Sequence, residues 1–218
     1  MYETFDETNS DYMRYIGRRH KLTGQLDGPY TTYYSNGAIW FQTTYCNGQR
    51  NGSYTEYYED GQLERAYTYK NGEIHGSYMQ YYEDGSICIE AEYANDERHG
   101  YYKEYYRSGA LAYDYTYIEG YKCGDCIAYY ETGAKRQVTT YDLNGAVVYK
   151  IVHYYESGNM EAVYIYSENE ELVQKIEYYD MPLQKGFGTP NGMASEQIYA
   201  YGKCVHSSRW CENGERIP

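Results

Sequence analysis

The residues of this chain best suited to metal or redox chemistry are its cysteines. The segment Cys123-Gly-Asp-Cys126 is the one pair of cysteines with a two-residue spacer. Such a pair could form half of a zinc site or a redox couple. Zinc needs two further ligands nearby, whereas Cys204 and Cys211 lie far along the chain. We therefore expect both thiols to be structural, and we expect no metal and no other cofactor.

The histidines and acids show no recognisable catalytic arrangement. No serine or cysteine forms a known nucleophile motif with any of the five histidines. Acids recur at regular intervals beside glycines, whereas general acid–base catalysis needs one unusual environment. Residues 186–192, Gly-Phe-Gly-Thr-Pro-Asn-Gly, are rich in glycine but lack the Lys-Ser/Thr pair of a phosphate-binding loop. The sequence therefore predicts a protein that is not an enzyme.

Charge and composition argue against several classes of partner. The chain has 32 acidic and 19 basic residues, a net charge of −13. It lacks the positive charge that nucleic acids or anionic membranes attract, and no apolar run is long enough for a membrane helix. The first residues, MYETFDETNSDYM, do not resemble a secretion signal. We therefore expect no nucleic-acid partner and no membrane partner. The expected location is intracellular: cytoplasmic or, for a viral protein, inside the virus particle. The cysteines should be mostly reduced there.

The elements that position these residues belong to a tandem repeat. The chain contains 36 tyrosines, and Tyr-Tyr doublets recur at steps of 24, 24, 24, 24, 25 and 24 residues. The doublets begin at residues 33, 57, 81, 105, 129, 154 and 178. Glycines keep the same period at Gly28, Gly52, Gly76, Gly100 and Gly124. Such regular self-similarity indicates a repeat architecture.

Each copy carries two turn signals and no helical periodicity. Asn71-Gly72 and Asp84-Gly85 favour the tight turns of β-hairpins. A two-residue loop at Asp60-Gly61 predicts the cross-strand pairs Tyr54 with Tyr67, Glu56 with Arg65, and Tyr58 with Leu63.

Across Asn71-Gly72, the same arithmetic places Tyr69 opposite Ile74 and Tyr67 opposite Gly76. A ring lying over a bare glycine would explain why this glycine recurs.

These signals predict an all-β fold, an elongated single-layer antiparallel β-meander of tandem hairpin repeats of about 24 residues. Its radius of gyration should exceed the ~17 Å of a compact chain of this length. We expect an N-terminal cap at 1–21 and about seven repeats over 22–180. Residues 181–218 should hold an insertion loop near 183–194, a degenerate last repeat at Trp210–Gly214 and a C-terminal cap.

The segment from Tyr69 to Gly85 resembles the MORN repeat, Y-x-G-x-x-x-N-G-x-x-H-G-x-G-x-x-x-x-x-x-G. The matching residues are Tyr69, Asn71, Gly72, His75, Gly76 and Gly85. Tyr78 and the Tyr-Tyr doublet depart from it, as in the MORN variant of the YwqK-type antitoxin family of bacteria; similar arrays occur in large DNA viruses. The resemblance implies a β-hairpin array that contacts proteins, with lipid binding proposed for some members, and it brings no catalytic residues.

Two functions remain open at this point. The first is a scaffold, adaptor or structural component that binds protein partners or assembles with itself. The second is an antitoxin or immunity protein that masks a toxin, which the negative charge suggests is basic. Exposed tyrosines are favoured at interfaces, so the expected contact residues are Tyr30, Tyr34, Tyr54, Tyr58, Tyr78, Tyr82, Tyr102 and Tyr106.

Overall fold

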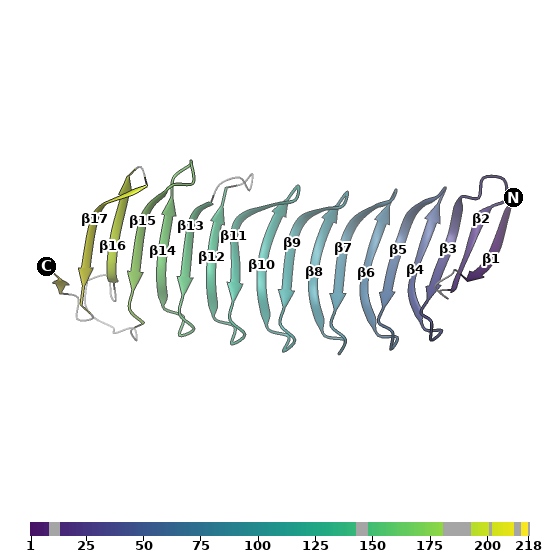
Figure 1. The fold of residues 1–218 in the computed structure, drawn as a ribbon, viewed down its shortest axis with the longest axis horizontal. Coiled ribbons are helices and arrows are strands. Elements are labelled where there is room, and N and C mark those ends of the chain that lie inside the picture. Colours follow the sequence, from purple (N-terminus) through teal and green to yellow (C-terminus); the bar gives the residue numbers. More distant parts are fainter. Residues whose placement is uncertain (9–13, 143–147, 181–192, 201, 212–214, 218) are drawn as a thin grey trace. The chain divides into compact units, whose positions relative to one another are not determined.

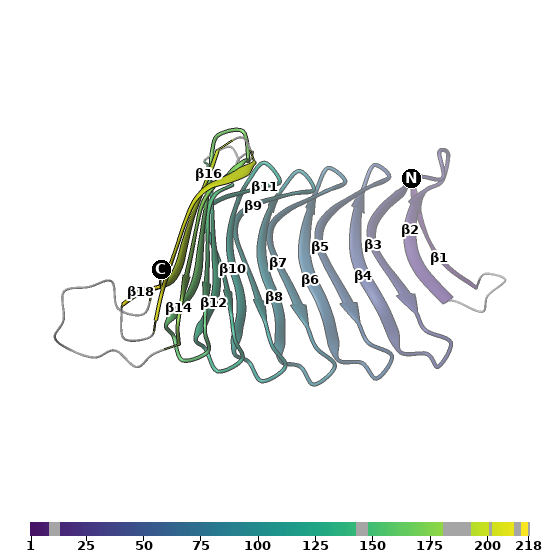
Figure 2. The ribbon, with the colours of Figure 1, turned by 60° about the vertical axis from the view of Figure 1, so that its left-hand side comes forward.

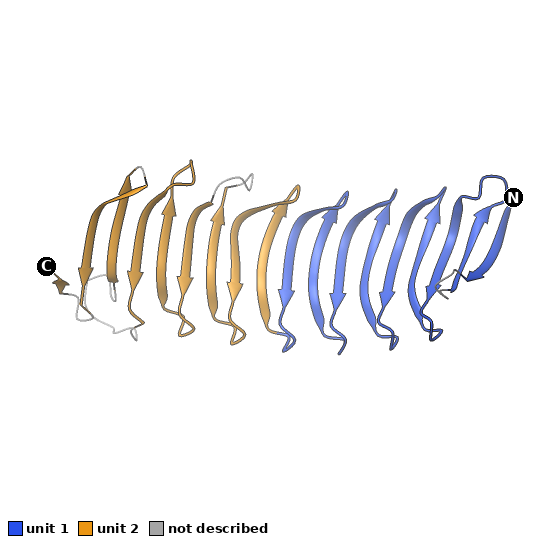
Figure 3. Ribbon diagram, viewed as in Figure 1, with its two compact units in different colours: residues 1–109 blue, residues 110–218 orange. Residues whose placement is uncertain are grey.

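The computed structural model describes residues 1–8, 14–142, 148–180, 193–200, 202–211 and 215–217. In these ranges every regular element is a β-strand (Figure 1). None of them contains a helix with the length and apolarity of a membrane crossing. The chain divides into two compact units, unit 1 at Met1–Gly109 and unit 2 at Ala110–Pro218 (Figure 3). Most of the expected insertion loop, residues 183–192, and part of the expected last repeat, residues 212–214, lie outside the described residues.

In unit 1, each strand pairs antiparallel with the next. The strands are β1 (Tyr2–Thr8), β2 (Arg14–His20), β3 (Leu26–Tyr33), β4 (Ile39–Cys46), β5 (Gln49–Tyr57), β6 (Leu63–Lys70), β7 (Glu73–Tyr81), β8 (Ile87–Ala94) and β9 (Glu97–Tyr105). They lie side by side in one layer (Figure 2). The segment expected to form the N-terminal cap contains the β1–β2 hairpin, and β2 pairs with β3.

Unit 2 is built in the same way. Its strands are β10 (Leu111–Ile118), β11 (Tyr121–Tyr129), β12 (Lys135–Tyr141), β13 (Val148–Tyr154), β14 (Met160–Tyr166), β15 (Leu172–Tyr178), β16 (Met193–Ala200), β17 (Lys203–Trp210) and β18 (Arg216–Ile217). The all-β antiparallel meander of hairpin repeats is therefore confirmed within each unit.

The turn at Asp60-Gly61 corrects one part of the expected register. Tyr58 N donates to Gln62 O at 2.8 Å and Gly61 N donates to Tyr58 O at 2.9 Å, so the loop has three residues, not two. Gly61 takes the left-handed conformation, with φ +91°, that such a loop requires. The Asp60 carboxylate stabilises it by accepting from Gln62 N at 3.0 Å.

The extra loop residue is compensated by a bulge in the following strand. Leu63 pairs with Tyr57, so its expected pairing with Tyr58 is wrong. A register shift between Glu56 and Tyr57 then restores the alignment. The expected pairs Tyr54 with Tyr67 and Glu56 with Arg65 are confirmed.

The recurring glycine represented by Gly76 has a different cause from the expected one. Tyr69 does pair with Ile74, but Tyr67 pairs with Tyr78, so the pairing of Tyr67 with Gly76 is wrong. A register shift lies between Tyr67 and Tyr69, and Gly76 has φ +88°. A Cβ atom there would meet nothing within 4 Å. The backbone conformation, and not the cover of a ring, therefore explains the glycine.

The core of unit 1 is a thin aromatic layer. Among the described residues, no large side chain is fully buried, although the small Ala91 is 0 % exposed. The buried cluster of Phe41, Tyr54 and Tyr69 is surrounded by the partly buried Tyr30, Trp40, Tyr67 and Ile74. The sheet therefore depends on contacts between neighbouring strands, as expected for a repeat array.

Candidate functional site

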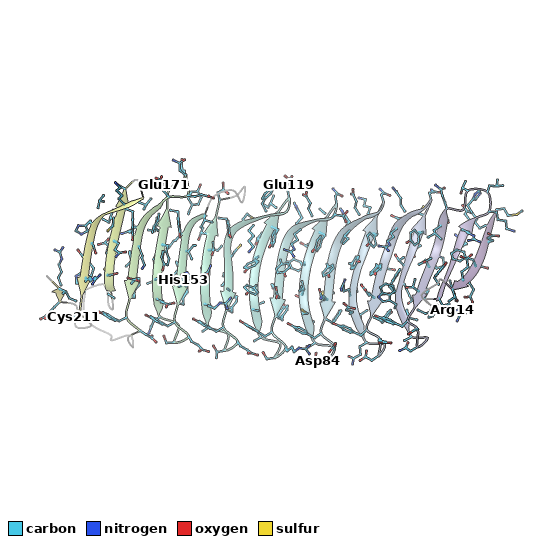
Figure 4. All side chains as sticks on the ribbon, viewed as in Figure 1. Arg14, Asp84, Glu119, His153, Glu171 and Cys211 are labelled. Atoms are coloured by element: carbon cyan, nitrogen blue, oxygen red, sulfur yellow. The ribbon has the colours of Figure 1, made fainter. Side chains whose placement is uncertain are left out.

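One face of the unit 1 sheet carries a row of stacked rings, and we call it the ladder face. The rings of Phe41 and Tyr54 stack with centroids 5.3 Å apart, Tyr54 and Tyr67 at 4.6 Å, and Tyr67 and Tyr78 at 5.3 Å. These residues come from the neighbouring strands β4, β5, β6 and β7. Figure 4 draws the side chains on the ribbon; successive side chains of a strand alternate between the two faces, and these stacked rings lie on one of them.

Four of the expected contact residues lie at one repeat position, and we call them the ladder tyrosines: Tyr30, Tyr54, Tyr78 and Tyr102. Tyr54 and Tyr102 are only 6 % exposed, while Tyr30 and Tyr78 are half-buried. Three of them donate to the side chain two residues later: Tyr54 to Glu56 at 3.3 Å, Tyr78 to Gln80 at 3.2 Å, and Tyr102 to Glu104 at 2.9 Å. Burial raises the pKa of Tyr30, Tyr54 and Tyr78, so these phenols stay neutral.

The other four expected contact residues, Tyr34, Tyr58, Tyr82 and Tyr106, are each the second tyrosine of a doublet. We call the tyrosines at this repeat position the latch tyrosines. The hydroxyls of Tyr34, Tyr58 and Tyr82 donate to the backbone oxygens of Tyr57, Tyr81 and Tyr105, at 2.7, 2.7 and 2.6 Å. Tyr106 occupies the same position in the repeat. In unit 2, Tyr130 and Tyr155 bond the backbone oxygens of Tyr154 and Tyr178 in the same way, at 2.8 and 3.0 Å. Each of these hydroxyls links one repeat to the next.

The environment of the latch tyrosines keeps them neutral. Burial, followed by nearby acids such as Glu64, raises the pKa of Tyr34 and Tyr58. Burial and a hydrogen bond with Cys88 raise the pKa of Tyr82 to about 12. Because these hydroxyls already have partners inside the fold, they are less available to another molecule than the sequence suggested.

An arginine that the sequence pattern did not single out completes the ladder face. The Arg50 guanidinium lies 5.7, 5.5 and 5.3 Å from the ring centroids of Phe41, Tyr54 and Tyr69. It donates to the Tyr69 hydroxyl at 3.0 Å. Arg98, at the same repeat position, lies 4.6 Å from the Tyr102 ring. The sequence did contain a signal for this arginine: Arg50 and Arg98 each stand two positions before a recurring glycine, Gly52 and Gly100.

The opposite face of unit 2 carries an aliphatic row that no sequence periodicity revealed. Consecutive cross-strand pairs join its members, Ile127, Val138, Val152, Val163 and Ile176. Val152 and Val163 are each 6 % exposed. The corresponding row of unit 1 begins Thr31, Gln42, Thr55 and Ala66. The row is therefore aliphatic in unit 2 and largely polar in unit 1, where Gln42 is exposed.

The cysteine pair Cys123 and Cys126 is reduced and enclosed. Both cysteines are free, and they are 5 % and 3 % exposed. Burial raises the pKa of the Cys126 thiol, which disfavours the thiolate that metal binding and redox chemistry use. Within the described ranges, no group of three or more His, Cys, Asp or Glu side chains is arranged to hold a metal ion.

One histidine does contact a serine, although no motif indicated it. A ring nitrogen of His206 lies 3.0 Å from Ser208 Oγ, which also accepts from Arg216 at 2.9 Å. Among the residues that the structure describes, no carboxylate contacts the second ring nitrogen of His206. The pair thus lacks the third member that orients the histidine of a nucleophilic triad.

Comparison with known families identifies the repeat itself. A model of the MORN repeat variant matches residues 26–47, 50–71, 74–95 and 98–119. The first three matches each span two consecutive strands: β3 with β4, β5 with β6, and β7 with β8. No curated protein sequence matches the chain. Each of these four segments is thus a MORN repeat of the variant type.

Proposed function

We propose that this protein is a non-enzymatic scaffold that binds a protein partner on the ladder face of unit 1. Repeat arrays of this kind present extended surfaces, in which successive hairpins supply equivalent contact positions. The observation that carries the proposal is the cluster of rigid, half-buried tyrosines with arginine on one uncovered face of the sheet.

The chemistry of this face is that of an interaction hot spot. Tyrosine and arginine are enriched among residues that dominate binding energy. The rings of Tyr30 and Tyr78 are half-buried and stacked or tilted against their neighbours. Because their rotamers are already fixed, a partner would lose little conformational entropy on contact.

The eight expected contact tyrosines divide into two roles under this proposal. Tyr30 and Tyr78 are contacted directly, since part of each ring is exposed. Tyr54 and Tyr102 are buried and serve to stabilise the sheet, and the latch tyrosines hold consecutive repeats together. Loss of a supporting ring would therefore weaken binding through the fold and not through a direct contact.

Quantitative affinity capture with matched double variants tests the contact surface. Tyr30→Ala with Tyr78→Ala alters the ladder face, whereas Tyr33→Ala with Tyr81→Ala removes the same side chains from the opposite face of the same strands, β3 and β7. A genuine partner should bind the wild type and the Tyr33→Ala, Tyr81→Ala variant, but not the Tyr30→Ala, Tyr78→Ala variant. Each hot-spot residue removed should cost ~2 kcal/mol or more in binding free energy. Circular dichroism and melting must show that both variants fold. Equal retention by the two folded variants would contradict the proposal.

A second candidate function is the masking of a basic toxin. The net charge of −13 and the exposed acids of the three-residue turns favour it; those acids are Glu59, Asp60, Glu83 and Asp84, and Figure 4 shows Asp84 at the edge of the sheet. A basic partner held there should bind more weakly as salt rises. Changing these four acids to their amides should then abolish capture, while the ladder-face variant should retain it.

A further inference from the structure

A hollow of about 120 Å³ opens on the unit 2 sheet, across β10, β11 and β12. Its floor is made by Cys126, Ala128 and Thr139, all 7 % exposed or less. Tyr113 and Tyr115 of β10 flank it on one side. The aromatic layer of the repeats is thus interrupted at this place.

The hollow arises where two repeat positions change together. Residue 126 stands 24 positions after Tyr102, and residue 128 stands 24 positions after Glu104. In the three preceding repeats a ladder tyrosine at the first position bonds an acid or amide at the second, as Tyr102 bonds Glu104 at 2.9 Å. Here Cys126 and Ala128 supply neither the ring nor the acceptor. One phenol and one carboxylate are missing from the same spot.

The surroundings of the hollow are cationic. Lys122 and Arg136 line it, and none of its lining residues is acidic, although the whole chain carries a charge of −13. Lys122 Nζ lies 3.9 Å from the centroid of the Tyr115 ring, and no carboxylate forms an ion pair with it among the described residues. Arg136 donates to the Tyr113 hydroxyl at 3.1 Å. Tyrosines therefore contact both cations at the hollow.

The size of the hollow suits one aromatic ring. Cavities of roughly 150 Å³ in protein interiors hold benzene, and a hollow of about 120 Å³ that opens to solvent admits a ring with its substituent outside. Flanking tyrosines offer edge or stacked contacts to such a ring. Gln137 and Thr139, bonded to each other at 2.7 Å, add polar atoms to the lining.

We propose that this hollow binds an aromatic carboxylate with a short aliphatic link, whose ring takes the place of the missing tyrosine and whose carboxylate meets Lys122 and Arg136. The same chemistry is offered by a free aromatic acid and by a C-terminal tyrosine or phenylalanine of a peptide. The inference is independent of the partner-binding role of unit 1, because it uses only residues of β10, β11 and β12.

Calorimetric titration with 4-hydroxyphenylacetate tests the proposal on the full chain. The neutral amide of the same compound should bind about fivefold more weakly, since it lacks the charge that the cations attract. Acetate, which lacks the ring, should show no binding. Equal binding of the acid and its amide would overturn the proposed role of the cations. A short peptide ending in tyrosine separates the two sources: tighter binding than the free acid assigns the site to a chain terminus, and weaker binding assigns it to a small molecule.

Matched variants locate the binding. Cys126→Tyr restores the repeat residue and fills the hollow, so affinity for the acid should fall at least tenfold, on the order of the loss of a buried ring contact. Ile127→Tyr adds the same side chain to the opposite face of β11, where Ile127 pairs with Val138, and should bind like the wild type. Unchanged binding by a folded Cys126→Tyr chain would overturn the proposal.

Lys122→Gln keeps the test decisive even if Cys126→Tyr does not fold. This change should weaken binding of the acid about fivefold and leave binding of the amide unchanged. A variant that binds both compounds as the wild type does would exclude Lys122 from the site and contradict the proposal.

Discussion

In several repeats of each unit, one tyrosine hydroxyl connects its repeat to the next one along the chain. Tyr58 bonds the backbone oxygen of Tyr81, 23 residues away, at 2.7 Å. The adjacent Tyr57 offers its own carbonyl to Tyr34. The two tyrosines of a doublet thus have different tasks, one as donor through its side chain and one as acceptor through its backbone.

Removal of one latch hydroxyl should measurably destabilise the fold. Tyr58→Phe keeps the ring but leaves the Tyr81 carbonyl without this donor, so we expect a loss of about 1 kcal/mol in unfolding free energy. Tyr57→Phe is the matched control, because its hydroxyl has no hydrogen-bond partner in the described part of the chain. Urea unfolding followed by circular dichroism measures both. A smaller effect for Tyr58→Phe than for Tyr57→Phe would contradict the latch.

Alkaline pH should unfold the protein through its buried tyrosines. Burial raises the pKa of Tyr58 and Tyr78, and burial with a Cys88 hydrogen bond raises the pKa of Tyr82 to about 12, above the ~10 of an unfolded chain. The unfolded state therefore loses these protons first, so this contribution to stability is complete below pH ~10 and is lost as pH rises toward 12. Ultraviolet absorbance of tyrosinate, read beside circular dichroism, should show these rings ionising only as the chain unfolds. Full ionisation without unfolding would contradict the prediction.

The residues of the ladder and latch could be located from the sequence, but their bonds could not. The 24-residue period fixes which tyrosines share a position. Whether a tyrosine hydroxyl is free to contact another molecule or bonds a carbonyl of the next repeat depends on the turn that follows the tyrosine. A three-residue loop at that turn changes where the hydroxyl points. The same limit applies to the hollow: Cys126 is visible as a gap in the tyrosine column, whereas the cations beside it depend on register.

At the scale of the hairpin, Gly61 of the three-residue loop should be required only because its backbone is left-handed, and not because a side chain there would clash. A Cβ atom at Gly61 would meet nothing within 4 Å, yet φ is +91°. Gly61→Ala should therefore cost about 1 to 2 kcal/mol in unfolding free energy from backbone strain. Gly61→Asn should recover much of this loss, because asparagine tolerates the left-handed region better. Thermal and urea unfolding of the two variants provide the comparison, and equal stability of both with the wild type would refute the strain.

The hairpins explain why the sequence predicted the strands correctly but not the lengths of the loops between them. Alternation and turn dipeptides predict the hairpins and the pairs Tyr54 with Tyr67 and Glu56 with Arg65. An Asp-Gly pair is compatible with loops of two or three residues, and a bulge can hide the difference. The aliphatic row of unit 2 was not predicted because its members are spaced 11, 14, 11 and 13 residues apart, and only the observed register aligns them.

At the scale of the molecule, unit 1 repeats a pattern in which equivalent residues 24 positions apart make equivalent contacts. Tyr54 pairs with Thr43 of the strand before it, and Tyr78 pairs with Tyr67 in the corresponding place. Tyr34 and Tyr58 reach the carbonyls of equivalent tyrosines. Stability in such an array comes from contacts between neighbouring repeats, so a complete repeat should be removable.

Deletion of residues 50–73 tests this modularity. The deletion joins Gln49 to Ile74, so β7 replaces β5 beside β4 and the Tyr34 hydroxyl can bond the Tyr81 carbonyl instead of that of Tyr57. We expect a folded chain whose melting temperature is lower by roughly 5 to 10 °C. Deletion of residues 62–73 is the matched control, because it removes one strand, reverses every later strand of the unit and moves the three-residue turns to the other edge. That chain should lose the latch bonds beyond β5 and its cooperative melting. Circular dichroism melts of the two deletions decide the matter: if both behave alike, the repeats are not the interchangeable units that their hydrogen bonds indicate.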